Sequence, residues 1–168
     1  MIILAMDTSG PCASVALMQD GVITHEETAR HGLTHSQTVL PMAERALECA
    51  GLQPKDVNLF ACAVGPGSFT GVRIGVTTVK ALAHSVGARC IGVDALEALA
   101  YGACGFNGTL APMFDARRSQ VYAAAFKGGA EFNRIGDDAA APLEEFVGTL
   151  PEGEVMFMGD GADANRAR

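Results

Sequence analysis

The sequence predicts an α/β protein of two lobes that share one folding unit. In each half an apolar strand ends in an aspartate, passes through a tight turn and returns as a second apolar strand, at 2–18 and at 110–126. Strand-like and helix-like segments alternate around these two units, which is typical of α/β folds. We therefore expect duplicated lobes at 1–105 and 106–168, with the second lobe truncated within its next helix.

Hydrophobic periodicity and turn residues define the elements of the first lobe. Asp20-Gly21 lies between two β-prone runs and is a strong hairpin signal. Apolar residues at helical spacing, followed by Gly51, predict a helix, although Pro41 leaves open whether it begins near Thr38 or kinks. The sequence thus predicts strands at 2–6, 12–19, 22–29, 59–64 and 89–93, and helices at 36–50, 71–86 and 95–103.

The second lobe continues the alternation after its strand–turn–strand unit. A Gly-Gly turn at 128–129 precedes a short strand, a helix near 142–149, a strand at 154–158 and the sequence GDG at 159–161. In the first lobe, the helix at 71–86 is apolar on most sides. Such a helix is either deeply buried or covered by a partner.

Charge and composition exclude several classes of function. Nineteen acidic residues against twelve basic ones give a net charge of −7. Unaided binding of nucleic acid is disfavoured, because that affinity depends on Lys and Arg neutralising phosphates. Arg117-Arg118 and the tail residues Arg166 and Arg168 are the only segments that approach a basic patch.

The cysteines and the apolar segments indicate a cytoplasmic protein. Five scattered cysteines without a C-x-x-C pair predict neither a disulfide framework nor a zinc ribbon, and we expect buried thiols. The apolar start lacks a basic region and reaches Asp7 too early for a signal peptide, and no apolar run is long enough to span a bilayer. The cysteines are Cys12, Cys49, Cys62, Cys90 and Cys104.

A glycine-rich loop, GPGSFTGVRIG at 65–75, joins a predicted strand to a predicted helix. No Gly-Lys-Ser/Thr follows it, the glycine spacing departs from G-x-G-x-x-G, and Ser68 lacks the flanks of a nucleophile elbow. Two interpretations remain, backbone N–H groups that face an anion or a purely structural tight turn. The candidate residues of this loop are Gly65, Gly67, Ser68, Thr70, Gly71 and Arg73.

The DTSG sequence after the first strand is a second candidate site. Its carboxylate and hydroxyls can hold a metal-bound water and nucleotide phosphates, or can form a local turn into the hairpin. His31 and His35 have helical spacing, but no glutamate completes a zinc motif and a helix-entry histidine is the simpler interpretation of His35. No spacing marks a nucleophile beside a base. The residues of the DTSG loop are Asp7, Thr8, Ser9 and Gly10.

Five segments in order resemble the TsaB (YeaZ) family. They are MDTS at 6–9, HSQTVLP at 35–41, the glycine loop, IGVDALEAL at 91–99 and DARRSQVYAA at 115–124. The resemblance implies an actin-like or Hsp70-like fold of the sugar kinase superfamily, with two ribonuclease-H-like lobes. It also implies a partner of the paralogous enzyme TsaD in making threonylcarbamoyladenosine, beside the anticodon of tRNAs that read codons starting with A.

Two departures from the catalytic paralogue indicate a subunit without catalytic residues. The paralogue carries two metal-ligand histidines in a GVNHxEGH-like stretch, where this sequence has Ala95 and Leu99, and hydrocarbon side chains cannot ligate a metal. The turn at 115–120 offers no glycine for backbone approach to a phosphate, although its arginines can meet one. We expect a vestigial phosphate loop at DTSG, no metal and no cofactor for the chain alone, with ATP only at a subunit junction of the complex.

The resemblance places the function on a surface of the first lobe. It implies that helices of this lobe pack against TsaD, that the ATPase TsaE is recruited to the pair, and that tRNA is met only through the complex. Whether the chain forms a homodimer when the partner is absent is left open by the sequence. The interface residues expected on the helix at 71–86 are Val72, Val76 and Val79, and periodicity leaves open which of the first two faces outward. A metallopeptidase-like (glycopeptidase) hydrolase and a small-molecule kinase remain as alternatives.

Overall fold

The computed structural model of the chain describes residues 1–30 and 34–166. These residues form two compact units, Met1–Val93 and Asp94–Arg168, which are described separately. Each unit holds one β-sheet and its own helices, so the structure has the mixed α/β class that the sequence predicts.

The boundary between the units lies earlier than the 105/106 division expected from the sequence. Helix α3 (Ala95–Tyr101) was assigned to the end of the first lobe, but it packs against β6 (Thr109–Arg117) and β7 (Gln120–Lys127). Since these contacts belong to the second sheet, α3 is part of unit 2.

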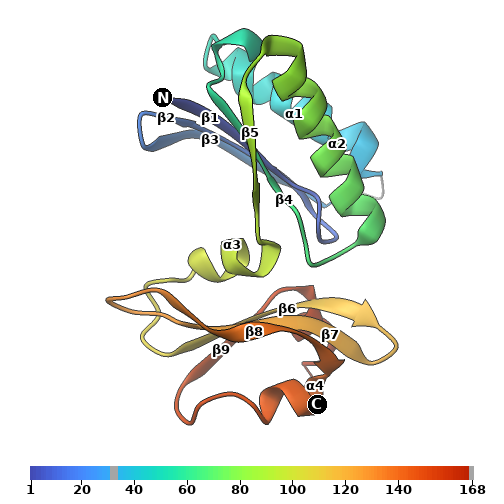
Figure 1. Cartoon of the computed structure of the whole chain (residues 1–168), viewed down its shortest axis with the longest axis vertical. Coiled ribbons are helices and arrows are strands. Elements are labelled where there is room, and N and C mark those ends of the chain that lie inside the picture. Colours follow the sequence, from blue (N-terminus) through green and yellow to red (C-terminus); the bar gives the residue numbers. More distant parts are fainter. Residues whose placement is uncertain (31–33, 167–168) are drawn as a thin grey trace. The chain divides into compact units, whose positions relative to one another are not determined.

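Unit 1 is a five-stranded sheet with two long helices on one side (Figure 1). Strands β1 to β3 are antiparallel, and β4 and β5 extend the sheet parallel to β1 in the order β3-β2-β1-β4-β5. Within the described residues, no helix is both long and apolar enough to cross a membrane. The elements are β1 (Ile2–Asp7), β2 (Ala13–Gln19), β3 (Val22–Ala29), α1 (His35–Cys49), the 3₁₀ turn η1 (Pro54–Asp56), β4 (Leu59–Ala63), α2 (Phe69–Val86) and β5 (Arg89–Val93).

The core of unit 1 lies between the sheet and its helices. Alternate residues of β1 and β2, such as Leu4 and Val15, are fully buried against α1 and α2, as the period of two in a strand requires. Helix α1 begins at His35 and continues through Pro41, so it does not begin near Thr38. Asp20 has a positive φ of 50° in the predicted hairpin turn.

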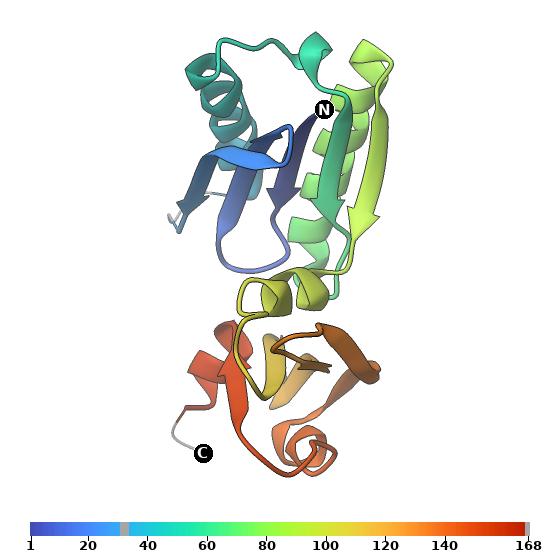
Figure 2. The ribbon, with the colours of Figure 1, turned by 90° about the vertical axis from the view of Figure 1, so that its left-hand side faces the viewer.

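Unit 2 is a four-stranded sheet with the order β8-β7-β6-β9. Strands β6, β7 and β8 are antiparallel and β9 is parallel to β6. Buried side chains such as Met113 and Phe146 join the sheet to α4. Figure 2 gives a second view of the ribbon. The remaining elements are β8 (Asn133–Pro142), α4 (Leu143–Val147), β9 (Val155–Met158) and α5 (Asp160–Ala164).

The two sheets confirm the internal repeat. The order β3-β2-β1-β4 in unit 1 corresponds to β8-β7-β6-β9 in unit 2, with three antiparallel strands and a parallel fourth in both. Unit 1 adds β5, which has no counterpart among the described residues of unit 2. The repeated strand–Asp–turn–strand pattern thus corresponds to one duplicated sheet.

The cysteines do not all lie where the sequence analysis expected them. Cys62 is buried on β4, and burial raises the pKa of its thiol above the ordinary value. Cys49 and Cys90 are exposed, so the expectation of buried thiols is wrong for these two. Cys49 is the last residue of α1 and Cys90 lies on the edge strand β5, where neighbouring elements cover little of either side chain.

Candidate functional site

The DTSG loop and the glycine loop contact each other directly. Thr8 and Ser9 are buried, and the Thr8 hydroxyl donates a hydrogen bond of 2.8 Å to the backbone oxygen of Gly71. The backbone N–H of Ser68 donates to the oxygen of Ser9 at 2.7 Å. The Ser9 N–H in turn donates to the Asp7 carboxylate at 2.7 Å. The two sequence motifs therefore form one folded unit, held by their own hydrogen bonds.

Three glycines at four-residue spacing allow this contact. A Cβ atom built at Gly67 would lie within 3.0 Å of the backbone oxygen of Ser9, and one at Gly71 within 3.0 Å of that of Thr8. A Cβ at Gly75 would lie 2.5 Å from the Thr8 hydroxyl oxygen. Real Cβ atoms do not approach other atoms so closely. The three glycines thus allow the backbone of α2 and of the loop before it to lie directly against the DTSG loop. Close packing is therefore enough to explain why these positions are glycine.

The start of α2 is fixed by the residues before it. Gly65 has a φ of +105° and precedes a cis peptide bond to Pro66, and Gly67 has a φ of +150°. Ser68 is the N-cap of α2, and its hydroxyl accepts a hydrogen bond of 3.2 Å from the Gly71 N–H. Several residues of the glycine loop therefore serve to begin this helix.

Gly10 and the nearby histidine complete the DTSG turn. The Nε2 atom of His35 lies 3.0 Å from the backbone oxygen of Gly10, so His35 serves at the entry of α1, as the simpler interpretation had it. His31 lies outside the described residues. The hydroxyl oxygen of Ser9 is buried and has no hydrogen-bond partner among the described residues. Ser9 therefore carries the group of this loop that a bound ligand could satisfy.

The assignment of Val79 to a partner interface is wrong. Val79 has 0% of its surface exposed and belongs to the core of unit 1. The buried face of α2 is formed by Gly71, Gly75, Val79 and Ala83, which recur every four residues. Val76 is partly buried against the same core, and Val72 lies over Gly65.

The exposed face of α2 carries different side chains. Phe69 is 75% exposed in the first turn, and the guanidinium of Arg73 lies 5.2 Å from the centre of its ring. A shallow cavity of about 410 Å³ is lined by residues of α1 and α2. Phe69 was not among the residues expected from the sequence, although an aromatic residue four positions before an arginine at a helix start indicates that the two side chains can meet. The cavity residues are Ser36, Thr70, Arg73, Ile74, Thr77 and Thr78.

The two positions that correspond to metal ligands in the paralogue carry packing residues. Ala95 is buried at the start of α3, and Leu99 lies against Gly159, where its side chain would be 3.0 Å from an added Cβ. Across the described residues, no group of three or more His, Cys, Asp or Glu side chains could hold a metal ion. The residues present at this site therefore do not fit a metal.

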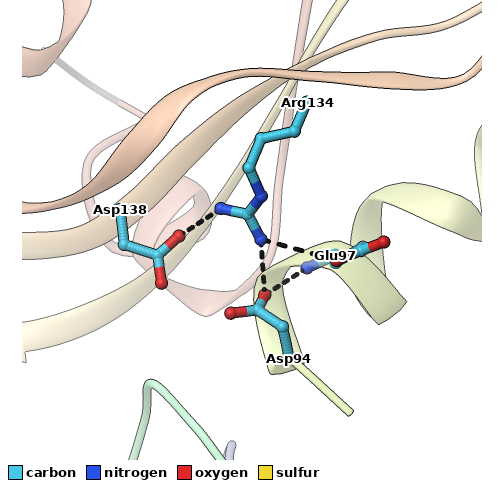
Figure 3. A network of polar contacts seen from close by, with 4 residues as sticks. All are labelled: Asp94, Glu97, Arg134 and Asp138. Atoms are coloured by element: carbon cyan, nitrogen blue, oxygen red, sulfur yellow. Dashed lines mark hydrogen bonds and ion pairs between the residues drawn. The ribbon is translucent and has the colours of Figure 1, made fainter.

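The start of α3 is instead occupied by a charge network (Figure 3). Asp94 caps the helix, since its carboxylate accepts a hydrogen bond of 2.7 Å from the Glu97 N–H. The guanidinium of Arg134 lies 3.2 Å from Asp94 and 3.6 Å from Glu97, and it donates to Asp138. It also lies 4.7 Å from the centre of the Phe126 ring. The network ties the edge strand β8 to the first turn of α3.

The electrostatics of this network keep the arginine charged. Partial burial disfavours the charged form of Arg134, but the hydrogen bond to Asp138 and the charge of Asp94 outweigh it, and the pKa of the guanidinium is raised. Because Asp94 and Glu97 are paired with this side chain, the part of the IGVDALEAL segment from Asp94 to Leu99 has a structural role in unit 2.

The chain is similar to known proteins along most of its length. Residues 16–158 match the family model described as TsaD: tRNA N6-adenosine threonylcarbamoyltransferase. The TsaB protein of Bacillus subtilis is 36% identical over 163 residues, and that of Escherichia coli is 40% identical over 130 residues; both are described as tRNA threonylcarbamoyladenosine biosynthesis proteins. The solved structure of YeaZ from Pseudomonas aeruginosa superposes with a TM-score of 0.87 at 30% identity.

The extent of these similarities differs between the chains compared. The B. subtilis alignment covers 95% of this chain and 71% of the relative, and the E. coli alignment covers 76% and 55%. The P. aeruginosa structure matches 98% of this chain and 78% of its own. The chain therefore spans only part of the length of each relative.

Proposed function

The chain belongs to the TsaB (YeaZ) family of tRNA threonylcarbamoyladenosine biosynthesis proteins, and from this premise we propose that it acts as a non-catalytic subunit. It binds a TsaD-type catalytic subunit and thereby activates threonylcarbamoyl transfer to the adenosine beside the anticodon of tRNAs that read codons starting with A. The observation that carries this proposal is the exposed aromatic and polar face of α2.

The composition of that face favours a protein partner. Phe69 places a large aromatic side chain in solvent, and Arg73 stacks on it. Aromatic residues and arginine are the types that most often dominate binding energy in protein interfaces. The cavity beside them runs between α1 and α2 and offers threonine hydroxyls for hydrogen bonds. A helix pair of the partner, laid across this face, would bury Phe69 and fill the cavity.

The loops that a catalytic member would use support a non-catalytic role. Thr8 is buried and bonded to Gly71, and Ser68 is bonded to Ser9, so the DTSG and glycine loops satisfy much of their own polar surface. Ala95 and Leu99 offer no metal ligands. We infer that the chain by itself binds nucleotide weakly or not at all, and that ATP is held at a subunit junction of the complex.

The remaining partners follow from the same proposal. The pair of subunits recruits a TsaE-type ATPase, and tRNA is bound through the complex rather than by this chain alone, in keeping with its net charge of −7. The chain works in the cytoplasm, where its tRNA substrate is found. When the TsaD-type partner is absent, the exposed face of α2 can be covered by a second copy.

Calorimetric titration with the TsaD-type protein of the same organism tests the proposal. We expect one-to-one binding, and we expect Phe69→Ala to weaken it about thirtyfold, the loss typical of a central aromatic contact. Val22→Ala is the matched control, because Val22 is 64% exposed on the edge strand β3. Its affinity should equal that of the wild type.

Four outcomes contradict the proposal. If the wild-type chain does not bind the TsaD-type protein, the premise of the proposal fails. If the Phe69→Ala variant and the wild type bind that protein with equal affinity, the interface lies elsewhere. Metal-dependent peptide hydrolysis by the purified chain would favour a metallopeptidase-like function, and micromolar ATP binding with phosphoryl transfer to a small molecule would favour a kinase.

A further inference from the structure

The hairpin between β6 and β7 has a strained tip. Arg117, Arg118 and Ser119 have φ values of 63°, 51° and 59°, so three successive residues other than glycine adopt the left-handed conformation. Arg117 pairs with Gln120, and the register shifts between Asp115 and Arg117, which marks a bulge before the turn. Glycine and asparagine fill such positions at lower energy. Backbone geometry alone therefore gives no reason for two arginines here.

The Asp115 carboxylate bonds the backbone of the turn and not the arginine side chains. An oxygen of the Asp115 carboxylate accepts a hydrogen bond of 2.7 Å from the Arg117 N–H. Arg117 and Arg118 are exposed, and neither guanidinium has an ion pair or hydrogen bond with another described residue. Arg134, in contrast, is bound by three carboxylates. Strain retained at an exposed position is typical of binding segments.

The chemistry of the tip selects a phosphate-bearing ligand. A guanidinium presents a planar set of N–H donors that matches phosphate oxygens, and two adjacent ones can reach consecutive phosphates of a nucleic acid backbone. On the premise of the proposed function, the phosphate-rich molecule bound by the complex is tRNA. We propose that Arg117 and Arg118 contact backbone phosphates of the tRNA when it is bound to the assembled complex.

The salt dependence of tRNA binding gives this proposal a quantitative signature. Each phosphate contact contributes roughly 0.7–0.9 to the slope of log K against log salt concentration. In the complex of full chains, Arg117→Gln/Arg118→Gln should lower that slope by about 1.5 and weaken tRNA binding about twentyfold at 0.15 M salt. The double lysine variant, Arg117→Lys/Arg118→Lys, keeps both charges and should retain most of the slope.

A matched control separates a local contact from a change of net charge. Arg30→Gln/Arg89→Gln removes two exposed arginines outside the hairpin and alters the net charge equally. We expect this variant to bind tRNA with the wild-type salt slope. Circular dichroism of each variant, and titration of the TsaD-type subunit, establish that the fold and the complex are intact before tRNA is added.

Four results would overturn the inference, and they differ from a failure of the proposed function. If the complex is intact and the Arg117→Gln/Arg118→Gln variant binds tRNA like the wild type, the tip does not contact RNA. If the control variant loses as much tRNA affinity, the effect comes from net charge and not from a local contact. Loss of the TsaD-type subunit on changing the hairpin identifies a protein contact instead. Weakened ATP binding with unchanged tRNA binding assigns the arginines to nucleotide phosphates. If the wild-type complex does not form, the proposed function itself fails.

Discussion

Gly71→Ala places a methyl group where α2 meets the DTSG loop. The new Cβ would lie within 3.0 Å of the backbone oxygen of Thr8 and 3.3 Å from the His35 ring. The oxygen of Thr8 belongs to backbone and cannot turn away as a flexible side chain would. Helix and loop must separate, which also breaks the buried bond from the Thr8 hydroxyl to the Gly71 oxygen.

The expected loss of stability follows from three contributions. Overpacking against backbone costs about 3 kcal/mol, at the upper end of the usual range, and loss of the buried hydrogen bond costs about 1 kcal/mol. The higher helix propensity of alanine returns about 1 kcal/mol. The free energy of unfolding should therefore fall by about 3 kcal/mol, a large fraction of the 5–15 kcal/mol typical of a domain.

Urea denaturation followed by circular dichroism measures this change, with Gly21→Ala as the matched control. Gly21 has a φ of +86° with no atom within 4 Å of an added Cβ, so alanine there should cost only about 1 kcal/mol from the left-handed backbone. A Gly71→Ala protein within 1 kcal/mol of the wild type would refute the close approach of α2 to the DTSG loop.

Three further predictions concern the same loop, the metal and an ion pair of unit 1. Ser9→Ala removes a buried hydroxyl without a partner, so we expect unchanged or slightly raised stability and full partner binding; folded protein that fails to support modification would instead indicate a ligand at Ser9. Elemental analysis should find no stoichiometric iron or zinc, and one tightly held metal lost on changing His31 or His35 would contradict this. The hydrogen bond from Arg45 lowers the pKa of Glu27, so the pair stabilises the fold above the ordinary pKa of the carboxyl and loses this effect as pH falls through the folded pKa. Glu27→Gln should therefore lower the melting temperature at pH 7 but hardly at pH 3, and an equal difference at both values would contradict the assignment.

The sequence predicted the features that depend on local pattern. Turn residues such as Asp20-Gly21 and the strand–Asp–turn–strand repeat were sufficient for the β2–β3 hairpin and the duplicated sheet. The glycine loop was left with two interpretations, and only the contacts across to Thr8 and Ser9 show how much of it serves packing. Those contacts join segments about sixty residues apart, which spacing within one segment cannot reveal.

The misassigned face of α2 has a physical reason. Apolar periodicity gave weight to valines, whereas the buried face is formed largely by glycine and alanine with Val79 among them. Glycine and alanine let the helix backbone pack closely against its neighbours. A pattern based on side-chain hydrophobicity therefore underestimates how often such residues lie on the buried face. The Arg134 network and the assignment of α3 to unit 2 depend on contacts with later strands. The partner of Asp94, for example, is Arg134, which lies on β8 forty residues later.

The most direct test of the proposed role as an activating subunit is a reconstituted modification assay. TsaD-type and TsaE-type proteins of the same organism would be mixed with a threonylcarbamoyl donor, ATP and unmodified tRNA, with and without this chain. Modification should require the chain and should be lost with a folded Phe69→Asp variant, because an unpaired carboxylate cannot be buried in the interface. Full modification without the chain, or with the Phe69→Asp variant, would contradict the proposed function.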